Sequence, residues 1–224
     1  MCKLGPSLMC ADLGNLERDI RALDHAGVDF YHIDVMDGKF APNFTLGPDF
    51  VKTVRKITDK PLDIHLMIEE PERYIDLFAD CGVEMISVHQ ESTPNLQRTL
   101  SQIQSKGIKA GVAVNPATPL DFLDYVFDVT DYVVMMTVNP GFAGQKFLPA
   151  MYEKIKNLKQ KIDQYDRDIE IQVDGNIGEA TIPGCRENGA SMYVLGTSAV
   201  FNSNHTLQEN VENTRKLFQA VEAN

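Results

Sequence analysis

The chain has 224 residues, of which 43% are hydrophobic, so it can bury one sizeable core, and we expect one α/β domain over residues 1–224. Its formal net charge of -11 and sequence pI of about 4.8 argue against nucleic acid and anionic membranes as partners, because both would be repelled. The four cysteines form no CxxC pair, and there is neither a signal-like apolar N-terminus nor a run of about 18 apolar residues, which predicts a cytoplasmic protein that does not span a membrane.

Eight apolar segments with the composition of β-strands follow one another along the chain. They cover residues 4–7, 30–35, 61–67, 85–89, 109–114, 132–138, 169–174 and 192–196. Between them, apolar residues recur every three or four positions, as from Leu13 to Leu23, which predicts amphipathic helices. Prolines directly after Thr93 and Thr118 predict two helix starts with those threonines as N-caps.

This alternation of strands and helices predicts a (β/α)8 TIM barrel. In such a barrel the loops that follow the strands build the active site at one face of the molecule. The alternative is a doubly wound open sheet, but no glycine fingerprint follows the first strand.

Polar side chains occupy one face of three predicted strands. His32 and Asp34 alternate with apolar residues in the second strand, His65 does so in the third, and Asp174 ends the seventh. Because the apolar faces must meet the helices, the polar faces converge on an enclosed space. A lone histidine there would more often be a hydrogen-bonded core residue, but two imidazoles and two carboxylates form a ligand set for one divalent metal ion. Mixed nitrogen and oxygen donors suit Zn, Fe, Mn or Co better than Mg.

Small residues end three neighbouring strands in the second half of the chain. They are Gly141, Phe142, Ala143 and Gly144 after the sixth strand, Gly175 and Asn176 after the seventh, and Gly196, Thr197 and Ser198 after the eighth. Such loops let backbone N–H groups approach an anion closely, and barrels frequently bind phosphate after strands seven and eight. Any single glycine could instead serve only a tight turn. Together the three loops predict a phosphate site.

Other side chains near the strand ends are candidates for contact with a substrate. They are Ser7, Met36, Met67 and Met136. Apolar methionine walls would exclude water from a carbanion-like intermediate, although core filling is their more common role, and Ser7 could equally be a turn residue. We expect Asp37 and Asp63 to be outer partners of the site or turn residues, and His25, His89 and His205 to be structural or surface residues.

Six segments carry motifs in the order found in one known family. They are residues 6–8, 32–38, 65–67, 136–145, 173–175 and 196–198. Together they resemble the ribulose-phosphate 3-epimerase family over nearly the whole chain. The resemblance implies a ribulose-phosphate binding barrel, a homo-oligomer, that inverts C3 of a small phosphorylated ketose with one divalent metal ion. It further implies that the metal ligands are His32, Asp34, His65 and Asp174, that Asp34 and Asp174 are also the two acid/base groups, and that Ser7 and His65 contact the sugar.

A few positions depart from the pentulose-phosphate enzymes of this family. Ala143 stands where glycine is usual, Asn176 follows Asp-Gly where another glycine is common, and residues 196–198 replace a shorter Gly-Ser. Two of these departures, with residues 7–10, resemble the D-allulose-6-phosphate branch. We therefore expect conversion of D-allulose 6-phosphate to D-fructose 6-phosphate, with D-ribulose 5-phosphate to D-xylulose 5-phosphate as the alternative.

Two functions of other classes compete with epimerisation. A metal-free decarboxylase or a synthase on a phosphate-binding barrel would need a catalytic lysine among the strand ends, and none of the predicted ends has one. A non-catalytic binding barrel would leave two buried acids and two imidazoles without a role.

Overall fold

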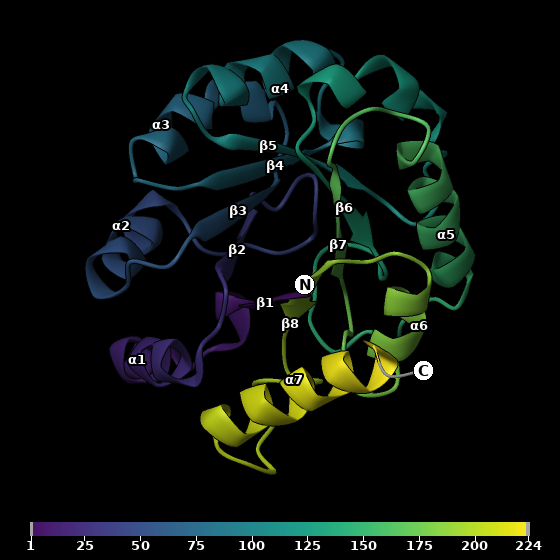
Figure 1. The fold of residues 1–224 in the computed structure, drawn as a ribbon. Helices are drawn as coiled ribbons and strands as arrows, with labels where there is room; N and C mark the ends of the chain where they lie inside the picture. The colour runs from purple at the N-terminus through teal and green to yellow at the C-terminus, as the bar shows by residue number, and fades with distance from the viewer. Residues whose placement is uncertain (1, 223–224) are drawn as a thin grey trace.

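The computed structural model describes residues 2–222, in which strands form an inner ring and helices surround it (Figure 1). The strands are β1 (Lys3–Pro6), β2 (Tyr31–Met36), β3 (Leu62–Met67), β4 (Met85–His89), β5 (Lys109–Val114), β6 (Tyr132–Met136), β7 (Glu170–Asp174) and β8 (Met192–Leu195). The helices are α1 (Leu16–Ala26), α2 (Pro48–Ile57), α3 (Ile75–Ala79), α4 (Leu96–Ser105), α5 (Ala150–Ile162), α6 (Ile182–Glu187) and α7 (Leu207–Glu222). The predicted (β/α)8 barrel is confirmed, and every expected strand is present.

The sheet is parallel throughout and runs in the order β1-β8-β7-β6-β5-β4-β3-β2. β1 and β2 share no ladder; within residues 2–222 a single bridge between Ser7 and His32 pairs them. We call this joint the seam. Phe30 fills the space beneath it, since a Cβ atom on Gly5 would lie 2.1 Å from the Phe30 ring.

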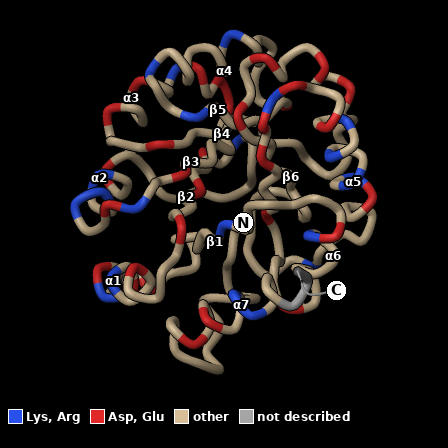
Figure 2. Tube along the Cα trace, in the orientation of Figure 1, with Lys and Arg blue, Asp and Glu red and all other residues tan. Residues whose placement is uncertain are grey.

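The strands are apolar on the face that meets the helices. In β2 this face is formed by Tyr31, Ile33 and Val35, which belong to the main buried apolar cluster together with Ile20 and Leu23 of α1. Lysine, arginine, aspartate and glutamate positions lie mostly along the outer helices and loops of the chain trace, with both signs interspersed (Figure 2). The polar residues of β2, β3 and β7 therefore have no helix to meet and point into the barrel.

The connection between β5 and β6 differs from the prediction. The proline that follows Thr118 does not start an α-helix; the chain forms two 3₁₀ segments, η5 (Asp121–Tyr125) and η6 (Phe127–Val129). Aromatic and β-branched residues dominate this stretch, and they are poorer helix formers than alanine or leucine. The predicted N-caps are also wrong, because α4 begins after Asn95, and Thr118 donates its hydroxyl to Glu91 instead.

A close contact inside the barrel gives a test of the packing. Gly111 of β5 lies beside Tyr132 of β6, and a Cβ atom there would fall 2.3 Å from the tyrosine ring. The ring cannot move freely because its hydroxyl bonds to Asp63 at 2.7 Å. We expect Gly111→Ala to lower the free energy of unfolding by about 2–3 kcal/mol, measured by urea denaturation. Gly47→Ala, where the new Cβ meets nothing within 4 Å, is the control; equal losses would contradict the argument.

Candidate metal centre and active site

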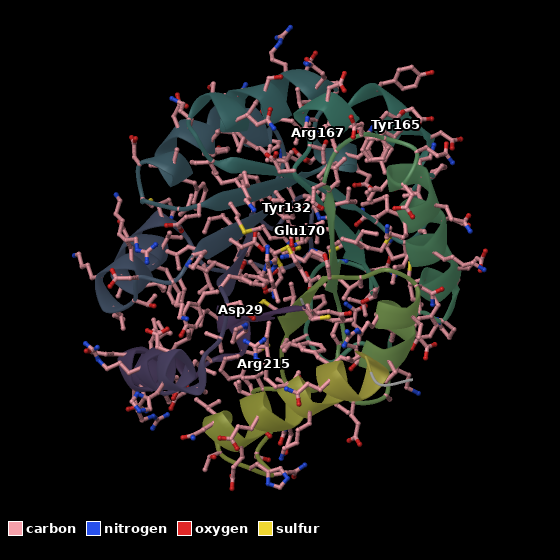
Figure 3. The ribbon with its side chains drawn as sticks, in the orientation of Figure 1. Asp29, Tyr132, Tyr165, Arg167, Glu170 and Arg215 are labelled. Atoms are coloured by element: carbon pink, nitrogen blue, oxygen red, sulfur yellow. The ribbon has the colours of Figure 1, made fainter. Side chains whose placement is uncertain are left out.

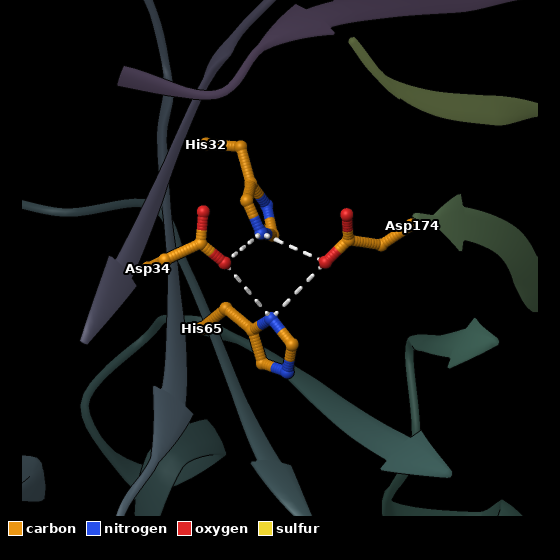
Figure 4. Close-up of side chains that lie close together, drawn as sticks. All are labelled: His32, Asp34, His65 and Asp174. Carbon is orange, nitrogen blue, oxygen red and sulfur yellow. Dashed lines mark ion pairs between the residues drawn. The ribbon is translucent and has the colours of Figure 1, made fainter. Parts of the chain in front are cut away.

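Four side chains from three strands bring one donor atom each to the same point inside the barrel (Figure 4). Nε2 of His32 lies 3.3 Å from Oδ1 of Asp34 and 3.6 Å from Oδ2 of Asp174. Nδ1 of His65 lies 3.4 Å from Oδ1 of Asp34 and 3.5 Å from Oδ2 of Asp174. All four donor atoms lie within 4.8 Å of one another. The four residues predicted as ligands are thus brought together.

The two nitrogen atoms that face this point make no hydrogen bond with any described residue. Both His32 and His65 are fully buried, and an unpaired buried polar atom costs about 1–3 kcal/mol. A shared cation would satisfy both nitrogens and neutralise both carboxylates. The four nitrogen–oxygen separations of 3.3–3.6 Å are those of ligands that lie about 2.0–2.2 Å from one shared ion. The group could therefore hold a divalent metal ion.

Charges around this point favour the ionised form of Asp34. Burial raises the pKa of Asp34, but the imidazoles of His32 and His65 outweigh it and lower that pKa below its usual range. Burial lowers the pKa of His32, yet the carboxylates of Asp34 and Asp63 hold it well above its usual range. A metal ion must therefore displace protons from the imidazoles to bind.

Asp63 contacts the ring nitrogen of His32 that points away from the donor group. Its Oδ2 lies 2.8 Å from Nδ1 of His32 and accepts a hydrogen bond of 2.7 Å from Nε2 of Gln172. Its Oδ1 accepts a hydrogen bond of 2.7 Å from the hydroxyl of Tyr132, which stands at the centre of the barrel (Figure 3). Because a carboxylate only accepts, His32 keeps a proton on Nδ1, so Nε2 is the nitrogen that would give up its proton and bind a metal ion. Sequence reasoning placed Asp63 as an outer partner but missed Tyr132 and Gln172.

This support gives a second prediction. Asp63→Asn places an NH₂ group among three donors, so one of them must lose its acceptor inside the barrel. We expect Zn²⁺ affinity to fall about 10–100-fold, measured by competition with a chromophoric chelator. Asp24→Asn, which alters a carboxylate bound by Tyr31 on the helix side of β2, is the control. A similar loss in both variants would assign the effect to general destabilisation.

His65 is supported by a different chain of groups. Its Nε2 lies 2.9 Å from Nε2 of His89, whose Nδ1 lies 3.1 Å from Oε2 of Glu91. Burial lowers the pKa of His89 to about 4, so this imidazole is neutral near pH 7. Burial raises the pKa of Glu91, but hydrogen bonds from His89 and Thr118 outweigh it and lower that pKa to about 2. Sequence reasoning treated His89 as structural; its place on the inward face of β4 was the missed signal.

A pocket at the carboxyl ends of the strands opens above the donor group. Of the four proposed ligands, Asp34 and Asp174 line it and the two histidines do not. Its lining includes every other predicted site residue, namely Ser7, Met36, Met67, Met136, Gly141, Phe142, Ala143, Gly144, Gly175, Asn176, Gly196, Thr197 and Ser198. Met9, Cys10, Asn139 and Gln145 also line it. His65, predicted to contact the sugar, lies behind the wall with its side chain fully buried. Among the described lining residues there is no lysine or arginine.

The three predicted loops meet at one side of this pocket. Gly175 has φ of 123°, and a Cβ atom there would lie 2.6 Å from the Val138 side chain, so this position requires glycine. Asn176 adopts φ of 53°, a conformation that asparagine tolerates better than most residues. Its Oδ1 accepts a hydrogen bond from the Ser198 hydroxyl, which joins the loops after β7 and β8. The departure from glycine at Asn176 is thus accommodated by the backbone.

Residues 3–201 match the ribulose-phosphate 3 epimerase family. The chain belongs to the ribulose-phosphate 3-epimerase family. Within this family, the ribulose-phosphate 3-epimerase of Bacillus subtilis is 48% identical over 202 residues, covering 90% of this chain and 93% of the relative. The chloroplastic ribulose-5-phosphate-3-epimerase of Arabidopsis thaliana is 44% identical over 202 residues, covering 89% and 72%. As a member of the ribulose-phosphate 3-epimerase family, the chain is an isomerase that acts on a sugar phosphate.

Solved structures of other sequences share the barrel. KGPDC from Streptococcus mutans superposes with a TM-score of 0.76 over 98% of both chains at 11% identity, which shows the fold alone. Within residues 2–222, no helix has both the length and the apolar character that a membrane span requires.

Proposed function

We propose that the protein interconverts D-ribulose 5-phosphate and D-xylulose 5-phosphate. The observation that carries the proposal is the pair of carboxylates at the floor of the pocket, Asp34 from β2 and Asp174 from β7. They face each other across two imidazole nitrogens that make no hydrogen bond with any described residue. The relatives named above favour the pentulose over D-allulose 6-phosphate, the hexulose expected from the loop sequences. That first expectation is therefore replaced by its alternative.

Asp34 and Asp174 are proposed to move the proton at C3. Inverting this carbon requires one base on each face of a planar enediolate, so that one carboxylate removes the proton and the other returns one from the opposite side. The Ser7 hydroxyl donates to Oδ2 of Asp34 at 2.7 Å, which fixes the orientation of that carboxylate. Ser7 also lines the pocket, so the same hydroxyl is placed to meet the sugar.

His32, Asp34, His65 and Asp174 are proposed to hold one Zn, Fe, Mn or Co ion. Such an ion, when bound, would supply positive charge where the oxygens at C2 and C3 become negative. Met36, Met67 and Met136 form apolar walls around the same space and would exclude water from the anionic intermediate.

Phosphate is proposed to bind to the loops after β6, β7 and β8. The pocket lacks a lysine or arginine among its described lining residues, so backbone N–H groups of the glycine-rich turns are the donors that remain. This also explains how a protein with a net charge of -11 binds an anion.

The test is an assay of D-ribulose 5-phosphate and D-allulose 6-phosphate side by side with Zn, Fe, Mn and Co. We expect kcat/KM to be at least about tenfold higher for the pentulose, which corresponds to about 1.4 kcal/mol of transition-state binding. A preference for the hexulose would restore the first expectation, and no turnover of either sugar would contradict the proposal. A homo-oligomer is proposed from the family resemblance, and sedimentation equilibrium measures it.

A further inference from the structure

The two candidate histidine ligands face the metal centre with different ring nitrogens. His32 presents Nε2 and bonds through Nδ1 to Asp63, whereas His65 presents Nδ1 and bonds through Nε2 to His89. A neutral imidazole can offer a lone pair from only one nitrogen. The two rings must therefore hold opposite tautomers, and something must fix each one.

For His32 the adjacent carboxylate of Asp63 is sufficient, but the neighbour of His65 is another imidazole. His89 can accept from His65 or donate to it, so contact with His89 alone leaves the tautomer of His65 undecided. Both rings are fully buried, with centroids 5.0 Å apart and planes 18° apart. Neither ring is exposed to bulk solvent that could supply a different partner.

Glu91 removes this ambiguity. Its Oε2 lies 3.1 Å from Nδ1 of His89, and because a carboxylate only accepts, that nitrogen carries the proton. Nε2 of His89 is then an acceptor, so His65 donates from Nε2 and keeps the lone pair on Nδ1. We infer that Glu91, acting through His89, is a positioning residue that sets the tautomer of His65 and so makes its Nδ1 available to the metal ion.

The other oxygen of Glu91 fixes the donor-to-acceptor direction of the hydrogen bonds that link Glu91, His89 and His65. Oε1 accepts from the backbone N–H of Asn115 at 2.9 Å and from the hydroxyl of Thr118. Both donors lie in the loop after β5, whereas Glu91 follows β4. The backbone N–H of Asn115 cannot reverse its role, so an oxygen must face it. The loop after β5 thereby influences a metal ligand on β3 without touching it.

Glu91→Gln tests the inference because it should exchange donor and acceptor in each hydrogen bond from residue 91 through His89 to His65. The amide oxygen must face the N–H of Asn115, which leaves the NH₂ group facing His89. Nδ1 of His89 then has to accept, its Nε2 carries the proton, and His65 must place its own proton on Nδ1. We expect the dissociation constant for Zn²⁺ to rise about 10–100-fold, measured by chelator competition at pH 7.5.

Two further measurements separate this effect from loss of charge or of fold. Glu69→Gln removes a negative charge at the mouth of the barrel, where Glu69 pairs with Lys39, and should leave Zn²⁺ affinity unchanged within twofold. In a His89→Gln background, an amide oxygen can accept from His65 without help, so adding Glu91→Gln should change affinity less than threefold.

Imidazole ¹⁵N spectra give the readout that does not depend on activity or on a variant. In the Zn²⁺-loaded wild-type protein we expect the proton of His89 on Nδ1 and that of His65 on Nε2. The inference rests on the proposed metal centre, and different results would disprove each of them. A wild-type protein that binds no Zn²⁺ would overturn the centre, whereas normal Zn²⁺ affinity in Glu91→Gln, or the opposite tautomer of His89 in the wild type, would overturn the inference alone.

Discussion

Replacing Asp34 or Asp174 with asparagine is expected to lower kcat for epimerisation by about 10⁴-fold, the upper end of what acid/base groups contribute. An amide cannot take a proton from carbon, and the two carboxylates approach the site from β2 and β7, on opposite sides of the donor group. Neither can substitute for the other, because each faces one side of the intermediate. The measurement is conversion of D-ribulose 5-phosphate at saturating metal.

Solvent exchange at C3 distinguishes the two roles. With one carboxylate left, exchange of the C3 proton with deuterium should persist for one sugar epimer at most, and the two variants should retain it in opposite epimers. Asp49→Asn is the control, because that side chain is fully exposed on α2. Near wild-type turnover in both active-site variants would refute the assignment of two bases.

Removing the metal ion is expected to abolish epimerisation and to weaken the fold. An ion present at 100–1,000 times its dissociation constant stabilises the folded state by about 2.7–4.1 kcal/mol. A chelator should therefore lower both kcat and the melting temperature, and adding back one divalent ion per chain should restore them. Full activity of protein shown by elemental analysis to be metal-free would contradict the ligand set of His32, Asp34, His65 and Asp174.

The metal-free protein should also acquire a pH dependence of its own. The pKa of His32 in the folded state is raised well above 6.5, so its contribution to stability is fully present below pH 6.5 and is lost as the pH rises through the raised value. Urea denaturation of the metal-free protein should therefore show falling stability at alkaline pH. The metal-bound protein should lose less over the same range, because its imidazoles are already deprotonated.

Alternation of polar and apolar residues was enough to predict the barrel and its inner donor group. His32 and Asp34 lie two positions apart, so they share one strand face whatever the details of packing. The glycines after β6, β7 and β8 likewise marked the pocket, because loops after parallel strands meet at one end of a barrel. These features depend on short-range geometry, which a single sequence contains.

Other features depend on contacts between distant segments and could not be predicted. Glu91 and Asn115 meet because they follow β4 and β5, which are neighbouring strands of the sheet. No local pattern indicates which oxygen of Glu91 faces which donor. The bonds of Tyr132 and Gln172 to Asp63 need the register of strands far apart in the chain. The failed prediction of an α-helix after β5 has a local cause: Pro119 favours a helix start, but the residues that follow have weak helix propensity.

The seam between β1 and β2 affects how the barrel opens. Across it, Leu4 and Asp29 exchange two hydrogen bonds, and the Ser7 hydroxyl reaches Asp34, but no continuous ladder protects the backbone. Local unfolding should start there, so amides beside the seam should exchange with solvent faster than those of β4 to β6. A sugar phosphate that contacts both Ser7 and Asp34 would bridge β1 and β2 and hold the two strands together. Substrate binding should therefore slow amide exchange along β1 and protect the barrel from proteolysis.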